Sequence, residues 1–158
     1  MAVQDQLQAL YRSTVLEHSR EPHHFGQLAS SNRHATGHNP LCGDKCTVYL
    51  EVTNDALADI TFEGAGCAIC MASASIMTDT VRGRSLASAS AAADQVLQSF
   101  ADSQAADNDD LPGDMAALAA VRQYPSRIRC ATLAWQTLLA ALTGNVQTVT
   151  TEVTTNQS

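Results

Sequence analysis

Apolar and polar residues recur with two different periods along this chain, and the first pattern is helical. Leu7, Leu10, Tyr11 and Thr14 are spaced three to four residues apart. This spacing predicts a helix from about residue 4 to 18. The stretch "SREPHHFG" follows, and its proline and glycine end the periodic pattern.

Two later segments alternate between apolar and polar residues, as half-buried strands do. "TVYLEVTND" begins at Thr47 and ends in Asn-Asp, and "LADITFEGAG" begins at Leu57 and ends in glycines. Alternating runs joined by such a turn predict an antiparallel hairpin. We expect a third strand from within residues 25 to 38 to pair with it.

Helical spacing returns after Gly66. The segment "CAICMASASIMTDTVRG" is rich in small residues and stops at Gly83, so Cys67 lies at or just before a helix N-terminus. The predicted inner face of this helix consists of Ile69, Ala72, Ile76 and Thr80. The inner face of the next predicted helix consists of Leu86, Ala93, Val96, Leu97 and Phe100.

The last helix has the clearest apolar pattern and is predicted to be the main core helix. It follows Pro125, with Ser126 as the candidate N-cap. Its apolar stripe consists of Ile128, Ala131, Thr132, Trp135, Leu138, Leu139 and Leu142.

Two segments lack this periodicity. The segment from 101 to 114, "ADSQAADNDDLPGD", is acidic and predicts an exposed, solvated connector. From Gly144 the chain is polar and rich in threonine, so we expect residues 144–158 to form a mostly disordered tail in which a short strand could still form. Residues 1–143 are then the domain.

Composition narrows the classes of function. A chain of 158 residues suits one domain with a substantial core. Lys and Arg total 9 against 16 Asp and Glu, and the net charge of −7 argues against a nucleic-acid partner. No apolar run resembles a signal peptide or is long enough to span a bilayer, so we expect a cytoplasmic protein without a membrane partner.

Five cysteines in a reducing compartment indicate metal ligands or reactive thiols rather than disulfides. Cys42 lies in a turn, and Cys67 and Cys130 lie at predicted helix starts, where unpaired N–H groups favour the thiolate. Cys130 also lies off the apolar stripe of its helix, so packing explains it poorly. With Asp44, two residues after Cys42, these thiols offer four donors to one ion, the carboxylate being the harder and more labile ligand. The alternative, cysteines that pack as small hydrophobic residues, stays open.

Four motifs together resemble one known family. They occur in the order and spacing of the SufU-type proteins, which are relatives of the IscU scaffolds within the NifU N-terminal-like family. The motifs are "YRSTVLEHSREPHHFG", "NPLCGDKC", "FEGAGCAICMASASIMT" and "YPSRIRCATLAW", and the resemblance covers about residues 6 to 142. It implies an α+β fold in which a small antiparallel β-sheet packs against helices within a single domain.

The resemblance also implies a site. Cys42, Asp44, Cys67 and Cys130 match the residues that hold zinc in SufU-type proteins, or a [2Fe–2S] cluster in scaffolds. Arg127 matches the arginine that the family has beside this site. A guanidinium one helical turn from a thiolate would favour the anion and could pair with Asp44. The simpler interpretation of Arg127 is an exposed arginine at a helix start.

Some positions depart from the family pattern. "YPSRIRC" has no histidine before its last cysteine, so the chaperone that binds the corresponding stretch of IscU is not implied. The acidic connector fits the insertion that separates SufU-type chains from IscU. Cys46 and Cys70 are extra thiols, expected to pack as small residues, although either could compete as a second sulfur acceptor.

The histidines of the N-terminal motif are His18, His23 and His24. We expect them to structure the turn in which they lie or to face a partner, and not to bind metal.

These observations lead to three hypotheses. In the favoured one, a zinc-held Cys42, assisted by Arg127, accepts sulfane sulfur from the persulfide of a PLP-dependent, SufS-like cysteine desulfurase and passes it to downstream iron–sulfur assembly proteins. This is zinc-dependent sulfurtransferase chemistry rather than free-standing catalysis. In the second, the chain is a scaffold that assembles a [2Fe–2S] cluster and transfers it to apo-proteins. The third, a purely structural zinc domain, is disfavoured because Asp44 is a poor ligand for a permanent site.

Overall fold

Three antiparallel strands and a short fourth one form the sheet of this protein. The computed structural model describes residues 12–101, 111–144 and 148–150. The strands lie in the order β3-β2-β1-β4, and β4 runs parallel to β1. They are β1 (Arg33–Asn39), β2 (Asp44–Thr53), β3 (Ala56–Ala65) and β4 (Thr148–Thr150). The short strand that the tail composition permitted is therefore present as β4.

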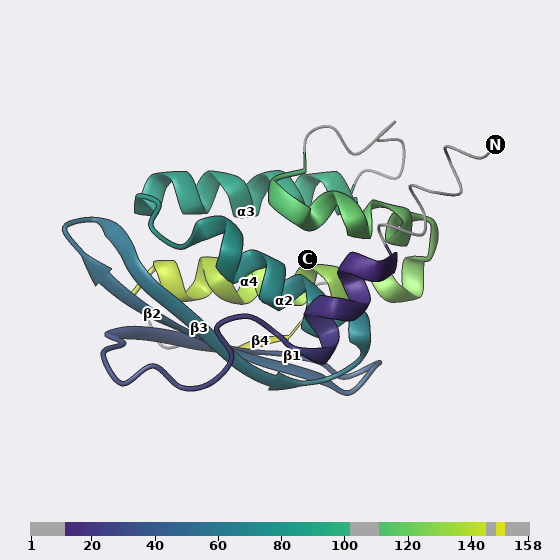
Figure 1. Ribbon diagram of the computed structural model, residues 1–158, viewed down its shortest axis with the longest axis horizontal. Helices are drawn as coiled ribbons and strands as arrows, with labels where there is room; N and C mark the ends of the chain where they lie inside the picture. Colours follow the sequence, from purple (N-terminus) through teal and green to yellow (C-terminus); the bar gives the residue numbers. More distant parts are fainter. Residues whose placement is uncertain (1–11, 102–110, 145–147, 151–158) are drawn as a thin grey trace.

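The helices lie on one face of this sheet (Figure 1). Residues 12–20 are helical, and the remainder of the predicted first helix lies outside the described residues. The others are α2 (Ala68–Val81), α3 (Leu86–Ala101), the 3₁₀ helix η1 (Gly113–Gln123) and α4 (Pro125–Leu142). This arrangement confirms the predicted α+β class. The predicted acidic connector lies mostly outside the described residues.

The predicted hairpin between β2 and β3 is confirmed. Its two turn residues, Asn54 and Asp55, have φ values of 53° and 62°. Asn and Asp tolerate this left-handed conformation, and two such residues make the turn whose twist matches that of antiparallel strands. The third predicted strand is also confirmed, because β1 pairs antiparallel with β2 along its length.

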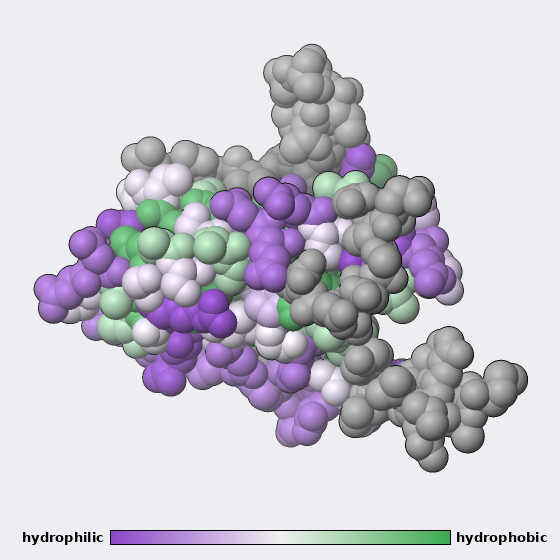
Figure 2. Space-filling model, turned by 90° about the horizontal axis from the view of Figure 1, so that it is seen from above, coloured by the Kyte–Doolittle hydropathy of each residue, from purple (hydrophilic) through white to green (hydrophobic). Residues whose placement is uncertain are grey.

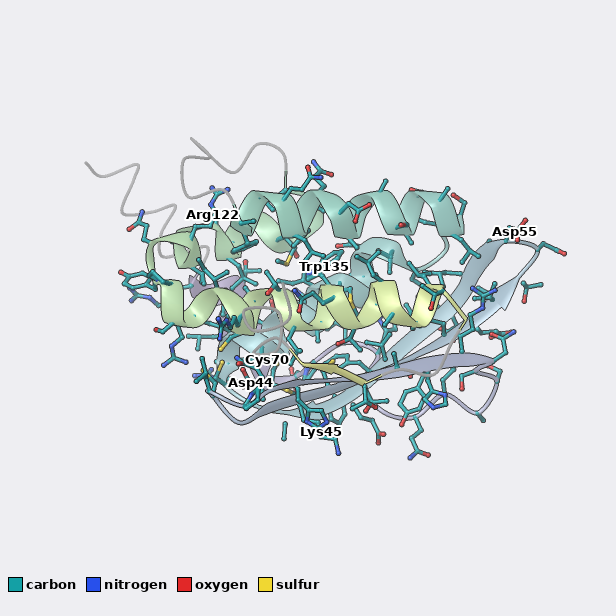
Figure 3. The ribbon with its side chains drawn as sticks, turned by 180° about the vertical axis from the view of Figure 1, so that it is seen from behind. Asp44, Lys45, Asp55, Cys70, Arg122 and Trp135 are labelled. Atoms are coloured by element: carbon teal, nitrogen blue, oxygen red, sulfur yellow. The ribbon has the colours of Figure 1, made fainter. Side chains whose placement is uncertain are left out.

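The helix α4 lies between the sheet and α3 (Figure 3). It approaches β1 closely at Gly37, where an added Cβ would meet the side chains of Leu133 and Thr137. Because both sides of α4 are covered, its burial extends beyond the predicted stripe to residues such as Cys130 and Ala134. The predicted Ser126 cap is wrong: α4 begins at Pro125, and the N-cap is Tyr124, whose side chain makes no capping bond. Proline suits this first position because its missing N–H has no partner there anyway.

The helix α2 is buried on almost every side. Its buried residues include the polar Ser73, Ser75 and Thr78, whose hydroxyl groups all form hydrogen bonds. Ser73 donates to the carbonyl oxygen of Ala131 and accepts from Nε1 of Trp135 at 3.2 Å. Small and hydroxyl side chains thus allow α2 to pack closely against α4.

The helix α3 is rich in alanine and serine. Seen from above, pale and green residues cover much of α3, and hydrophilic residues surround them (Figure 2). Across the ranges that the structure describes, no helix has both the length and the apolar character needed to cross a bilayer.

Candidate metal centre

The turn between β1 and β2 presents the first two candidate residues. The strands end at Asn39 and begin again at Asp44, which are paired in the register, so residues 40–43 form the turn. The backbone N–H of Cys42 donates to the carbonyl oxygen of Asn39 at 3.2 Å, and Gly43 has a φ of 71°. This left-handed conformation suits glycine. Cys42 is consequently exposed at the tip of the turn.

Asp44 points the other way, into the molecule. It is only 2 % exposed, while the next residue, Lys45, is exposed, as alternation along a strand requires. Figure 3 places Asp44 near Cys70 at one end of the sheet, opposite Asp55 at the hairpin turn. Oδ2 of Asp44 accepts from Nδ2 of Asn39 at 3.2 Å. A buried carboxylate with such partners is held in one orientation.

Cys67 is the N-cap of α2, as the sequence predicts. Its Sγ accepts from the backbone N–H of Cys70 at 3.5 Å, and its own backbone N–H donates to Oδ1 of Asp44 at 3.0 Å. An added Cβ on the preceding Gly66 would overlap the Asp44 carboxylate. Gly66 therefore allows the end of β3 to pass directly over Asp44.

Cys130 lies on α4 and is fully buried. Because α4 begins at Pro125, Cys130 is its sixth residue, and the prediction that it lies in the first turn is wrong. Burial raises its pKa, and hydrogen bonds with Asp44, Cys42 and Cys67 raise it further. The expected stabilisation of its thiolate by the helix N-terminus is thus outweighed, and a cation would be needed to hold Cys130 in its anionic form.

The structure brings these residues together from three elements. One ligand atom each of Cys42, Asp44 and Cys130 lies within 4.8 Å of the other two. Cys67 lies outside this mutually close group but beside it, since it contacts Asp44 through its backbone and affects the pKa of Cys130. Thiolate and carboxylate donors at this spacing fit the ligand chemistry of zinc. We call Cys42, Asp44, Cys67 and Cys130 the cysteine group.

Arg127 lies at the edge of the cysteine group. Its side chain is exposed, and its pKa is raised first by the charge of Cys67 and then by that of Cys130. Arg127 therefore lies beside these two cysteines, and its role in the site stays a prediction.

Asn39 belongs to the site as well, although the sequence patterns do not single it out. It is fully buried, and its Nδ2 lies 3.7 Å from Sγ of Cys130 in addition to its bond with Asp44. One amide thus positions two of the candidate donors. The pairing of Asn39 with Asp44 across the turn is the feature that could have revealed this role.

Cys46 and Cys70 are the two cysteines outside the cysteine group. Both are about 1 % exposed and belong to the hydrophobic core, as Cys130 also does, but the hydrogen bonds of Cys130 are with Asp44, Cys42 and Cys67. Burial raises the pKa of Cys46 to about 12 and also raises that of Cys70. Buried, protonated thiols are poor nucleophiles, which supports the packing interpretation.

Comparison with known proteins gives the family of this chain. An iron–sulfur cluster assembly scaffold protein IscU from Streptococcus pyogenes serotype M1 is 39% identical over 136 residues, which cover 86% of this chain and 84% of the relative. A zinc-dependent sulfurtransferase SufU from Bacillus subtilis is 36% identical over 138 residues, covering 87% and 92%.

Solved structures agree with these relatives. A crystal structure of a hypothetical protein superposes with a TM-score of 0.77 at 38% identity, covering 85% of this chain and 98% of the other. That of a putative iron–sulfur cluster assembly scaffold protein for the SUF system from Fervidobacterium islandicum gives 0.71 at 26% identity, covering 82% and 93%. The model of the NifU-like N terminal domain matches residues 10–143. The chain therefore belongs to the family of NifU-like N-terminal domains, together with IscU and SufU proteins.

Proposed function

We propose that this chain serves iron–sulfur cluster assembly by accepting sulfane sulfur on Cys42 and passing it on. The observation that supports this most is the mixed burial of the cysteine group, in which the exposed Cys42 stands beside the buried Asp44 and Cys130. A purely structural site has no use for an exposed thiol, whereas a sulfur acceptor must be reached by its partner. The names of the IscU and SufU relatives support the same process.

The sulfur donor is a persulfide on a PLP-dependent cysteine desulfurase of the SufS kind. The Cys42 thiolate attacks the outer sulfur, the S–S bond of the donor breaks, and the desulfurase cysteine leaves as a thiolate. Cys42 then holds the persulfide. One sulfur atom moves between two cysteines, so the step needs no oxidant or reductant. Downstream iron–sulfur assembly proteins receive this sulfur.

The residues around Cys42 have separate tasks in this proposal. Zinc, held by Cys42, Asp44, Cys67 and Cys130, would supply the positive charge that keeps Cys42 a thiolate. Asn39 keeps the Asp44 carboxylate oriented. Arg127, beside Cys67 and Cys130, stabilises negative charge at the site and can pair with Asp44 when that carboxylate exchanges.

Two exposed apolar side chains mark where the desulfurase would dock. Leu41, next to Cys42, is 64% exposed, and Tyr124, at the start of α4, is 59% exposed. The two segments are neighbours, because Sγ of Cys42 lies 3.9 Å from the carbonyl oxygen of Ser126. A partner that covers both side chains would shield Cys42 from water during transfer.

All five cysteines are free, which supports a cytoplasmic location.

A second candidate function is a scaffold that assembles a [2Fe–2S] cluster and hands it to apo-proteins. The observation that favours it is the number of thiols, because Cys42, Cys67 and Cys130 with Asp44 could ligate a cluster as cargo.

Elemental analysis of protein purified without oxygen separates the two functions. About one zinc for each chain and no colour would support the relay, and iron with sulfide in a brown solution would support the scaffold. The relay is then tested by the turnover of the desulfurase. The wild-type chain should stimulate it, Cys42→Ser should not, and Cys46→Ala, which changes a buried thiol, should behave like the wild type. Full stimulation by Cys42→Ser would refute sulfur acceptance at Cys42.

A further inference from the structure

A second group of potential ligands lies near the opposite end of α2 from Cys67. His18 comes from the helical residues 12–20, His23 from the loop that follows, and Asp79 from the C-terminal part of α2. One ligand atom of each lies within 4.8 Å of the other two. The ring centroids of the two histidines are 4.4 Å apart. We call these three residues the histidine group.

One hydroxyl positions both histidines of this group. Nδ1 of His18 lies 2.6 Å from Oγ of Ser75, and the backbone N–H of His23 donates to the same oxygen at 2.8 Å. His18 is only 3 % exposed, so its ring has little freedom to turn. The bond at Nδ1 leaves Nε2 of His18 for a ligand. A partner on the second nitrogen is the usual way in which proteins orient a ligating histidine.

The acidic side chain of the group faces the imidazoles. Oδ2 of Asp79 lies 2.5 Å from Nδ1 of His23, and Oδ1 lies 3.5 Å from Nδ1 of His24. From η1, Oδ2 of Asp114 lies 3.5 Å from Nε2 of His18. Two carboxylates and three imidazoles therefore converge from four separate segments. A cation between Asp79 and His23 would replace their direct contact.

We propose that His18, His23 and Asp79 form a second site for a divalent transition-metal ion. Two imidazoles and one carboxylate, without thiolate, suit Zn²⁺ or Fe²⁺ and leave coordination positions for water. The site is separate from the cysteine group, because the twelve residues from Cys67 to Asp79 span about 18 Å along a helix. The sequence alone led us to expect that these histidines do not bind metal. That expectation did not include Asp79, which the fold brings beside them.

Zinc content tests this site in the full chain. Protein is dialysed to equilibrium against micromolar ZnCl₂, and the zinc bound to each chain is measured. The double variant His23→Asn/Asp79→Asn should bind one zinc ion fewer than the wild type. The control His34→Asn, which changes an exposed histidine on β1, should bind as many as the wild type. Equal zinc content in wild type and double variant would overturn the proposal, even if the double variant melts at a lower temperature.

Removing the other site makes the test independent of the function proposed above. Cys67→Ser/Cys130→Ser protein should still bind one Co²⁺ ion, with weak visible absorption and no sulfur-to-metal charge-transfer band. Anaerobic dialysis against Fe²⁺ identifies the preferred ion, and binding of either Zn²⁺ or Fe²⁺ that depends on His23 and Asp79 supports the site. If neither ion binds in that way, the histidine group only ties the N-terminal segment to α2 and the proposal fails.

Discussion

The backbone N–H of Cys67 donates to Oδ1 of Asp44 at 3.0 Å. The Asp44 carboxylate is thus a candidate metal ligand, and it also holds the start of α2 against the start of β2. A substitution at Asp44 changes the ligand set and this backbone contact together.

Replacing the oxygen ligand by sulfur should tighten the site and impair its function. Asp44→Cys would give four thiolates, which bind zinc more strongly because a soft donor replaces a hard one. Cys42 is then harder to free, so stimulation of the desulfurase should fall several-fold in a fully metallated protein. Zinc competition and desulfurase turnover measure the two effects. Asp94→Cys, on the exposed side of α3, is the control and should change neither. Wild-type stimulation by a more tightly metallated Asp44→Cys protein would exclude ligand exchange.

Two glycine substitutions distinguish damage to the site from damage to the fold. Gly66→Ala places a methyl group against the Asp44 carboxylate, so metal affinity should fall. Gly83 has a φ of 85° and open space around it, so Gly83→Ala should cost about 1 kcal/mol of folding free energy through backbone strain and leave metal binding unchanged. Urea unfolding and zinc titration of both variants check this. Equal metal affinity of Gly66→Ala and wild type would show that the carboxylate can move aside.

Removal of the metal should lower the melting temperature. If one ion joins the β1–β2 turn, the start of α2 and α4, a strong chelator withdraws its binding free energy from the folded state. We expect a decrease of several degrees for the metallated wild type. A Cys67→Ser/Cys130→Ser protein, already without this ion, should show a much smaller shift. An unchanged melting curve of the wild type after verified metal loss would contradict a shared site.

Four of the five cysteines should separate into two classes. Cys46→Ala and Cys70→Ala should keep their metal, because both thiols lie outside the cysteine group, whose members Asp44, Cys42 and Cys67 hydrogen-bond with Cys130. Cys67→Ser and Cys130→Ser should lose it. Metal content of the four purified variants is the measurement, with circular dichroism to verify folding. Equal loss in all four would mean that the cysteine group is wrongly composed.

Alkaline pH should destabilise the protein in part through Cys46. Its pKa is raised by burial from 9.0 to about 12, so the unfolded chain loses this proton at lower pH than the folded one. The stability that depends on the protonated thiol is complete below pH 9 and is lost as pH rises from 9 towards 12, at up to about 1.4 kcal/mol per pH unit. Cys46→Val should lack this contribution. Urea unfolding of both proteins from about pH 8 to 10.5 tests it, and parallel stability curves would contradict it.

Most of the fold could be predicted because most of its helices and strands each show one clear repeat of apolar residues, every second residue in strands and every three to four residues in helices. The hairpin of β2 and β3 alternates between apolar and polar residues apart from a register shift between Glu51 and Val52. Its turn is Asn-Asp, and both left-handed turn residues are of the types that favour this conformation. The burial of α4 could not be predicted fully, because a stripe identifies one covered face, whereas α4 is covered by the sheet and by α3. The 3₁₀ helix η1 was missed since its tighter winding does not follow the 3.6-residue period.

The site was partly predictable for a similar reason. Residue type and family motifs single out Cys42, Asp44 and Cys130, and the structure places them together. Asn39 could not be predicted in this way, because its contact with Asp44 depends on the register of β1 and β2. That register depends in turn on a tight turn in which Gly43 has a positive φ. Asp79 could not be predicted either, since it meets His23 only through the packing of two segments 56 residues apart.

The long separation between Cys42 and Cys130 has a consequence for synthesis of the protein. Strands β1 to β3 and helix α2 precede α4 in the chain, so a growing chain can form the three antiparallel strands and expose three candidate donors before the fourth exists. Asn39 and the backbone N–H of Cys67 can already contact Asp44 at that stage, but Cys130 joins them only when α4 has left the ribosome. Tight metal capture therefore becomes available only once the chain includes α4. Metal retention can serve in the laboratory as a check that translation and folding have both reached this helix.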